Sequence, residues 1–193
     1  EKAVAAFDES IRMAEEAGLA TRVAGLHSAK CFLYRESGHL TEAEESLAEC
    51  KRTVMATDMR QSFKDNFAKG AFQHEAIIAA KKGDFETAMA RADEYLAKIQ
   101  VDNNPNEMQY HHGLVGLIHF EKGDHAKAIE HLNQGNQEGP YILYHLAVSE
   151  SKAGDRTRAS ELFKKVAEWN AYSSGYAFVR SKAMDALEMA EKE

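Results

Sequence analysis

Apolar residues recur at three- and four-residue intervals along nearly the whole chain. Ala3, Phe7 and Ile11 set this spacing at the start. A helix with this period carries one apolar face for burial, whereas no stretch suggests a strand. The sequence therefore predicts an all-α protein with helices at about residues 1–17, 20–37, 41–56, 60–82, 86–100, 107–122, 126–136, 140–153, 157–169 and 176–192.

Glycines divide this helical pattern at four places. Gly38, Gly83, Gly123 and Gly154 each close one apolar pattern and precede the next. A glycine readily adopts the left-handed conformation that ends a helix, and the Asp that follows three of the four can cap the next helix. Each glycine is therefore expected to mark a tight turn between two helices.

A small residue recurs in the same phase after each turn. Alanine lies five residues after each glycine, and four residues later comes another residue of the same stripe, as in Ala128 and Leu132 or Ala159 and Phe163. A small side chain there lets two helices approach closely. The opening pair Ala3 and Phe7 has the same spacing, so residues 1–17 are expected to be a second helix without its first.

These units resemble tetratricopeptide repeats, whose signature includes an Ala-x-x-x-Phe pair, a Leu-Gly and a Tyr in the first helix, and a closing Pro. Tyr34, Gly116, Pro140 and the Ala159 pair match parts of it. The first-helix Trp is missing, and the dividing glycines are 45, 40 and 31 residues apart, against 34 in the family. Longer helices are therefore expected in the front half.

The resemblance implies a right-handed α-α superhelix, a solenoid of helix-turn-helix repeats. It implies one domain over residues 1–193. The expected parts are a partial repeat at 1–17, repeats at 20–56, 60–100, 107–138 and 140–170, and a capping helix at 176–192.

First helices of such repeats line the concave face, so helical phase selects candidate groove residues. The aromatic members offer rigid contact area, and the three cations are able to meet carboxylates of a partner. The alternative is packing between neighbouring helices, which is favoured for Leu117, Phe120 and Val148 and evenly balanced for Tyr144 and His145. The expected partner-binding residues are Phe32, Arg35, Gln73, His74, Ile77, Lys81, Tyr110, Tyr141, Tyr144, His145, Val148 and Lys152.

Some members of the family hold a partner's C-terminal carboxylate with Lys and Asn from consecutive first helices. Here Ser28, Phe32, Gln73 and His74 stand at those places, which favours an internal or extended peptide segment instead. The resemblance thus predicts a scaffold that binds a peptide or protein partner in its groove. A regulatory or self-assembly domain of a larger protein, including a homodimer, is the alternative.

The nine histidines, six of them between His111 and His145, are the main candidates for chemistry. His112 and His119 share a helix face, but no metal-binding motif accompanies them. His74, His112 and His145 lie near the groove and would be able to converge on an ion or change charge below pH ~6.5. Structural roles are favoured, and we expect no metal site, no cofactor and no enzyme.

Charge and hydropathy limit the classes of partner that the sequence allows. The formal net charge of -7 disfavours nucleic acid, which requires clustered Lys and Arg. No apolar run is long enough to cross a bilayer, and the stripe formed by Met55, Met59, Phe63 and Phe67 is better explained by burial than by a membrane surface.

The compartment is left open by the sequence. The chain opens at Glu1 within an apparent helix, which suits a cytoplasmic protein or a trimmed exported, periplasmic one. Cys31 and Cys50 are expected to be buried thiols, with a disulfide in an exported form as the alternative.

Overall fold

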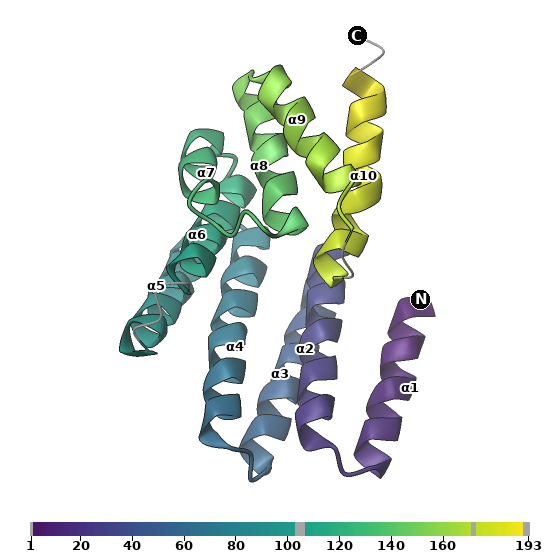
Figure 1. Ribbon diagram of the computed structural model, residues 1–193. Coiled ribbons are helices and arrows are strands. Elements are labelled where there is room, and N and C mark those ends of the chain that lie inside the picture. Colours follow the sequence, from purple (N-terminus) through teal and green to yellow (C-terminus); the bar gives the residue numbers. More distant parts are fainter. Residues whose placement is uncertain (1, 103–106, 171–172, 191–193) are drawn as a thin grey trace. The chain divides into compact units, whose positions relative to one another are not determined.

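The computed structural model describes residues 2–102, 107–170 and 173–190, which form ten α-helices and no strand (Figure 1). The prediction of an all-α protein is confirmed. The helices are α1 (Lys2–Glu16), α2 (Ala20–Glu36), α3 (Leu40–Ala56), α4 (Gln61–Lys81), α5 (Phe85–Asp102), α6 (Met108–Lys122), α7 (His125–Leu132), α8 (Pro140–Ala153), α9 (Arg156–Ala167) and α10 (Ser174–Ala190).

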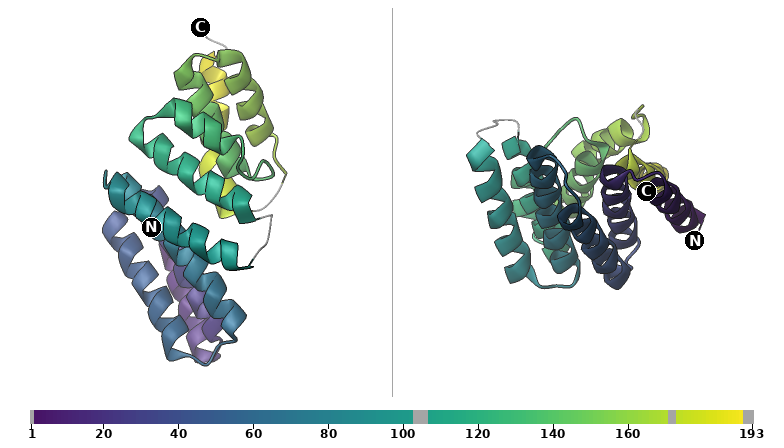
Figure 2. Two further views of the ribbon diagram at one scale, coloured as in Figure 1. Left: turned by 90° about the vertical axis from the view of Figure 1, so that its left-hand side faces the viewer. Right: turned by 90° about the horizontal axis from the view of Figure 1, so that it is seen from below.

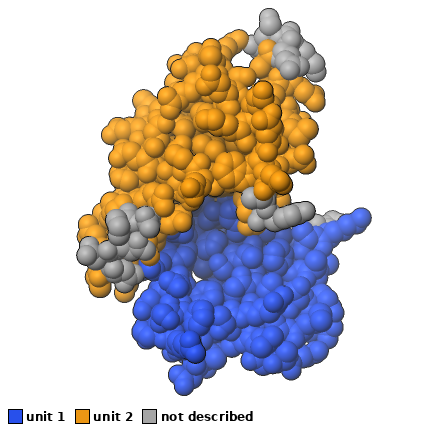
Figure 3. Space-filling view, viewed as in Figure 1, with its two compact units in different colours: residues 1–78 blue, residues 79–193 orange. Residues whose placement is uncertain are grey.

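The chain forms two compact units, residues 1–78 and residues 79–193 (Figure 3). In unit 1, α2 packs against α3 and α1 packs against α2. In unit 2, α6 packs against α7 and α8 against α9, so that the helices lie side by side as hairpins (Figure 2). This succession of adjacent helix pairs is the architecture of a tetratricopeptide-like solenoid. The expectation of a single domain over residues 1–193 stays a prediction.

The helix turns have the predicted chemistry. Gly38, Gly83, Gly123 and Gly154 all adopt positive φ, between 79° and 99°. At α7 and α9 the side chains of Asp124 and Asp155 accept hydrogen bonds from the backbone N–H of Lys127 and Arg158. These caps satisfy N–H groups that lack a partner within the helix.

The alanines that follow the four turns are all buried. Ala43, Ala88 and Ala128 are fully inaccessible, and Ala159 is 3% exposed. The tightest contact lies between α6 and α7. A Cβ at Gly116 would lie 2.7 Å from Cγ of Leu132 and 3.0 Å from its backbone nitrogen. The two helices therefore approach at a distance that only glycine permits at this position of α6.

The two cysteines are free, buried thiols, as predicted. Cys31 packs with Ala43, Leu47, Ala71 and Ile78, whereas Cys50 belongs to a separate apolar cluster. Burial raises the pKa of Cys31 to about 12 and that of Cys50 to about 11. Both thiols thus stay protonated and serve as small apolar side chains.

Helix α7 ends earlier than expected, at Leu132 instead of residue 136. Beyond it the backbone passes close to α6, since a Cβ at Gly135 would lie 3.2 Å from Cα of Gly113. The side-chain amide of Gln137 donates to the carbonyl oxygens of Leu132 and Gly135, at 2.7 and 3.3 Å. This close approach and the amide cap end the helix.

Several expected segments fall partly outside the described residues. They are most of the turn at 102–106, the turn that includes 171–172, and the ends of the first and last helices at residue 1 and residues 191–193.

The interpretation of the Met55 stripe as a buried one is wrong for two of its four members. Met59 is 8% exposed and Phe67 is half-buried, but Met55 is 83% and Phe63 42% exposed. The cause is the break between α3 and α4 at residues 57–60, which prevents the four residues from forming one continuous helical stripe. No helix of the described segments is long and apolar enough to cross a membrane.

The Gly116 contact predicts that Gly116→Ala destabilises unit 2. The added methyl group would overlap Leu132, so we expect the free energy of unfolding to fall by about 1–3 kcal/mol, measured by urea denaturation. Gly25→Ala is the matched control, because a Cβ at Gly25 in α2 has no neighbour within 4 Å. That variant is expected to keep or raise stability by up to about 1 kcal/mol. Equal losses in both variants would contradict the close approach of α6 and α7.

Candidate functional site

In unit 1 the predicted groove residues come from α2 and α4, and a histidine joins the two helices. His74 of α4 lies between two side chains of α2. Nη1 of Arg35 lies 3.1 Å from its Nδ1, and Oγ of Ser28 lies 3.1 Å from its Nε2. The sequence placed these residues on one face, and the structure brings them into contact.

The contacts fix the protonation of His74. A guanidinium only donates hydrogen bonds, so Nδ1 of His74 must accept from Arg35 and Nε2 carries the hydrogen, which it donates to Ser28. Burial first, and the positive charge of Arg35 second, lower the pKa of His74 to about 3. His74 is therefore a neutral linker between α2 and α4 at neutral pH.

Arg35 is buried rather than presented to solvent, with 7% of its surface exposed. Its Nε donates to Glu36 at 3.0 Å, and its guanidinium lies 4.8 Å from the ring centroid of Phe32. Ile77 is 2% exposed, and Gln73 is half-buried. In this unit the cation expected to meet a partner's carboxylate is already engaged within the protein.

In unit 2 aromatic rings gather around His145 of α8. Its ring centroid lies 4.4 Å from that of Tyr141, 5.3 Å from that of Tyr144 and 4.8 Å from that of Phe120 on α6. Nδ1 of His145 donates to the carbonyl oxygen of Tyr141 at 2.7 Å. Because only 6% of His145 is exposed, this side chain is a packing residue whose polar atom is satisfied locally.

Helix α10 covers part of this aromatic face. A Cβ at Gly175 would lie 3.0 Å from Cβ of Tyr141, so the start of α10 lies directly against that tyrosine. Burial and the nearby carboxylate of Asp185 raise the pKa of Tyr144. α10 packs on α9 and α8 much as α8 packs on α7 and α6, and it thus takes the place of a further first helix.

The remaining predicted residues of unit 2 differ in their accessibility. Lys81 donates to Glu121 at 2.8 Å, an ion pair whose two side chains are 19% and 23% exposed. Val148 is half-buried, whereas Tyr110 is 45% exposed and Lys152 is exposed. Tyr110 and Lys152 are therefore the predicted residues of this unit most accessible to a partner.

Three histidines, His112, His131 and His119, form a row between α6 and α7 that the sequence only partly indicated. The ring of His131 lies 5.4 Å from that of His112 and 5.8 Å from that of His119, centroid to centroid. His125 instead contacts Phe120, with their ring centroids 6.0 Å apart. Leu132 packs on Gly116, which lies between His112 and His119 along α6. The residue before Leu132, His131, therefore lies beside both histidines.

No group of three or more His, Cys, Asp or Glu side chains within the described ranges is arranged to hold a metal ion. Of the three histidines considered for convergence, His74 contacts Arg35 and Ser28, His112 contacts His131, and His145 contacts the α8 tyrosines.

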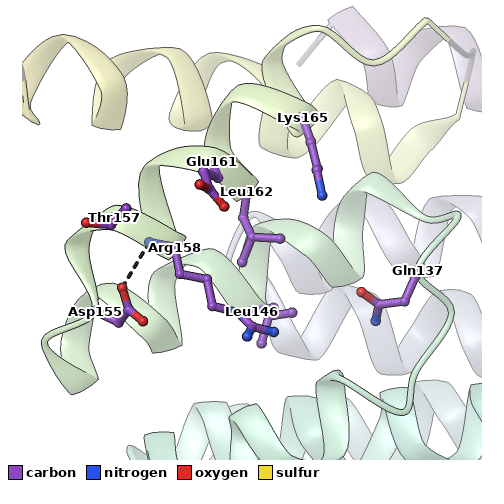
Figure 4. A pocket seen from close by; sticks show the side chains of 8 residues that line it. All are labelled: Gln137, Leu146, Asp155, Thr157, Arg158, Glu161, Leu162 and Lys165. Carbon is purple, nitrogen blue, oxygen red and sulfur yellow. Dashed lines mark hydrogen bonds between the residues drawn. The ribbon is translucent and has the colours of Figure 1, made fainter.

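A hollow of about 460 Å³ lies beside α9 and the segment before α8 (Figure 4). Leu146 and Leu162 line it, and Gln137 and Lys165 lie at the side away from Asp155 and Thr157. Its arginine, Arg158, is engaged with Glu150 at 2.9 Å and Asn133 at 2.6 Å. The hollow therefore offers a mixed polar lining without an uncommitted guanidinium.

The chain is similar in sequence to a protein of known role. The chain is 28% identical over 142 residues to the photosystem I assembly protein Ycf3 of Rippkaea orientalis (strain PCC 8801 / RF-1). The aligned part covers 67% of this chain and 80% of that protein. No family model matches the chain. No solved structure matches it either.

The contacts of His74 predict its titration. Its ring should stay neutral from pH 8 to pH 5 in NMR spectra, because its pKa is about 3. A histidine whose pKa is lower in the folded state binds fewer protons than the unfolded chain, so its contribution to stability is complete above about pH 6.5 and falls at lower pH.

Arg35→Met should raise the pKa of His74, since it removes the neighbouring positive charge. Arg12→Met is the control, because Arg12 is an exposed arginine of α1 paired with Glu9 and Glu16. A titration of His74 near pH 6.5 in the wild type would contradict this arrangement.

Proposed function

We propose that this chain is a protein-interaction scaffold that binds an extended segment of a partner protein along its first helices. The observation that carries the proposal is the distribution of tyrosine. Of the six tyrosines in the described ranges, Tyr95 is on the second helix α5, and the other five lie on first helices: Tyr34, Tyr110, Tyr141, Tyr144 and Tyr176. Tyrosine combines a large apolar ring with a polar tip and is enriched at protein interfaces.

The similarity to a photosystem I assembly protein supports a role in assembly. We infer that the partner is a subunit of a larger complex, which the scaffold holds while that complex is put together. Binding of this kind needs a complementary surface and no chemistry, so we propose no catalytic role and no cofactor.

The charges of unit 2 suggest where the partner segment lies. Lys81 is neutralised by Glu121, and His145 is enclosed by aromatic rings, so neither presents a free charge to a ligand. Lys152, near the C-terminal end of α8, is exposed. We propose that the segment contacts Tyr110 on α6 and places an acidic residue at Lys152 on α8.

The test is a double variant, Tyr110→Ala with Lys152→Ala, compared with the wild type in affinity capture from a lysate of the source organism. Loss of a central aromatic contact and a charge pair should lower capture of the partner by about tenfold or more. Circular dichroism and thermal unfolding should stay unchanged, because both side chains are accessible.

The matched control is Met55→Ala with Lys165→Ala, which removes one exposed apolar side chain and one exposed lysine from the second helices α3 and α9. It should capture the partner like the wild type. Equal capture by both double variants would exclude the first-helix face of unit 2 as the binding surface.

Self-assembly is the second candidate, and exposed methionines of α10 favour it. Met184 is 44% and Met189 67% exposed, which suits contact with a second copy. Light scattering after size-exclusion chromatography separates the two functions. A mass near twice 21.5 kDa that returns to one chain in Met184→Lys would support self-assembly, whereas a monomeric wild type would remove it.

A further inference from the structure

The histidine row of His112, His131 and His119 joins α7 to α6, and two of its ring nitrogens, those of His112 and His131, face each other. Nδ1 of His112 lies 3.2 Å from Nδ1 of His131. Two nitrogens at this distance form a hydrogen bond only when one carries a hydrogen and the other accepts it. The contact therefore depends on the number of protons that the pair holds.

The pair accommodates one added proton but not two. With one, an imidazolium N–H donates to a neutral ring, which is a charge-assisted hydrogen bond. With two added protons, both Nδ1 atoms carry hydrogens that point at one another while the nitrogens are 3.2 Å apart. The two positively charged rings then repel each other. His119 adds a third site, since its ring stacks on that of His131 at 5.8 Å with an interplanar angle of 19°.

The charges around the row come from several helices. On α7 and its cap, Lys127 and Glu130 act on His131, and Asp124 lies 3.8 Å from Nδ1 of His119. On α6, His111 lies beside His112, and Lys122 acts on His119. From α5, Glu86 and Asp93 line one pocket with His119. On α8 the buried ionisable groups are His145, which contacts aromatic rings, and Glu150, which pairs with Arg158.

We propose that this row is a pH-sensitive contact that holds α7 on α6 at neutral pH and releases it when more than one of its three histidines is protonated. Helix α7 suits this role, because it has eight residues, the fewest among the described helices. A helix this short depends on tertiary contacts for its stability. The inference concerns the local stability of unit 2 and does not depend on the proposed binding role.

Burial supports the direction of the effect. It is the largest cause of the lowered pKa of His131 and of His119, and the neighbouring histidines lower both further. Since these pKa values are lower in the folded state, the stabilisation is complete above about pH 6.5 and decreases as the pH falls below that value. His74 makes the stability of unit 1 fall with pH in the same direction. The test must therefore measure the stability of α7 itself and not that of the whole chain.

The test is amide hydrogen exchange of the full chain at pH 7.5 and pH 5.5, expressed as protection factors. In the wild type, protection of α7 should fall by about tenfold or more at the lower pH, because the open state binds more protons than the folded contact. In the double variant His112→Asn with His131→Asn, amide groups that do not titrate replace the two rings near both Nδ1 positions. This variant should lose most of the pH dependence of α7 protection. Protection of α2 and α3 should change equally in both proteins.

His39→Gln is the control for loss of a histidine, because His39 is an exposed residue of unit 1, its side chain 60% accessible. It should leave the pH dependence of α7 unchanged. If the double variant does not fold at pH 7.5, NMR titration of the wild-type rings still decides. Two titration steps in the signals of His131 support the proposal, as expected of a ring coupled to its neighbours, whereas a single step of His131 near pH 6.5 would overturn it. An equal loss of α7 protection in the double variant would overturn it as well.

Discussion

The close approach of the second helix to the first in the pairs α2–α3, α6–α7 and α8–α9 is the constraint on which the rest of this structure depends. It is most severe where Leu132 of α7 meets Gly116 of α6, with no room for a Cβ. The buried alanines Ala43 of α3 and Ala159 of α9 fulfil the same condition in the other two pairs. Small residues at these points let backbones pack closely, and the contact distance then decides which neighbouring side chains are enclosed.

Enclosure explains why two buried histidines of the first helices, His74 and His145, have hydrogen-bond partners within the protein. A buried donor or acceptor without a hydrogen bond is destabilising, and first helices are covered by neighbours on more than one side. His74 is therefore held by Arg35 and Ser28, and His145 donates to the carbonyl oxygen of Tyr141. These side chains stabilise contacts between or within helices, and they leave the more exposed positions for binding.

The sequence was sufficient for features set by local chemistry. Glycine at positive φ, an Asp cap and a helical period act over a few residues, so the turns, the caps and the helix succession were predictable. The early end of α7 was not, because it depends on Gly135 approaching Gly113 on another helix. The burial of Arg35 and the covering of Tyr141 by the start of α10 also depend on neighbouring helices, which helical phase on one helix cannot reveal.

The same packing separates two kinds of histidine in unit 2. His145 is enclosed by aromatic rings, and its Nδ1 donates to the carbonyl oxygen of Tyr141. His131 lies between two further histidines because Leu132 must fit over Gly116, which places the preceding side chain beside His112 and His119. The fit of one leucine over one glycine thus places three titratable rings at one helix contact, and the pH dependence proposed for α7 follows from this placement.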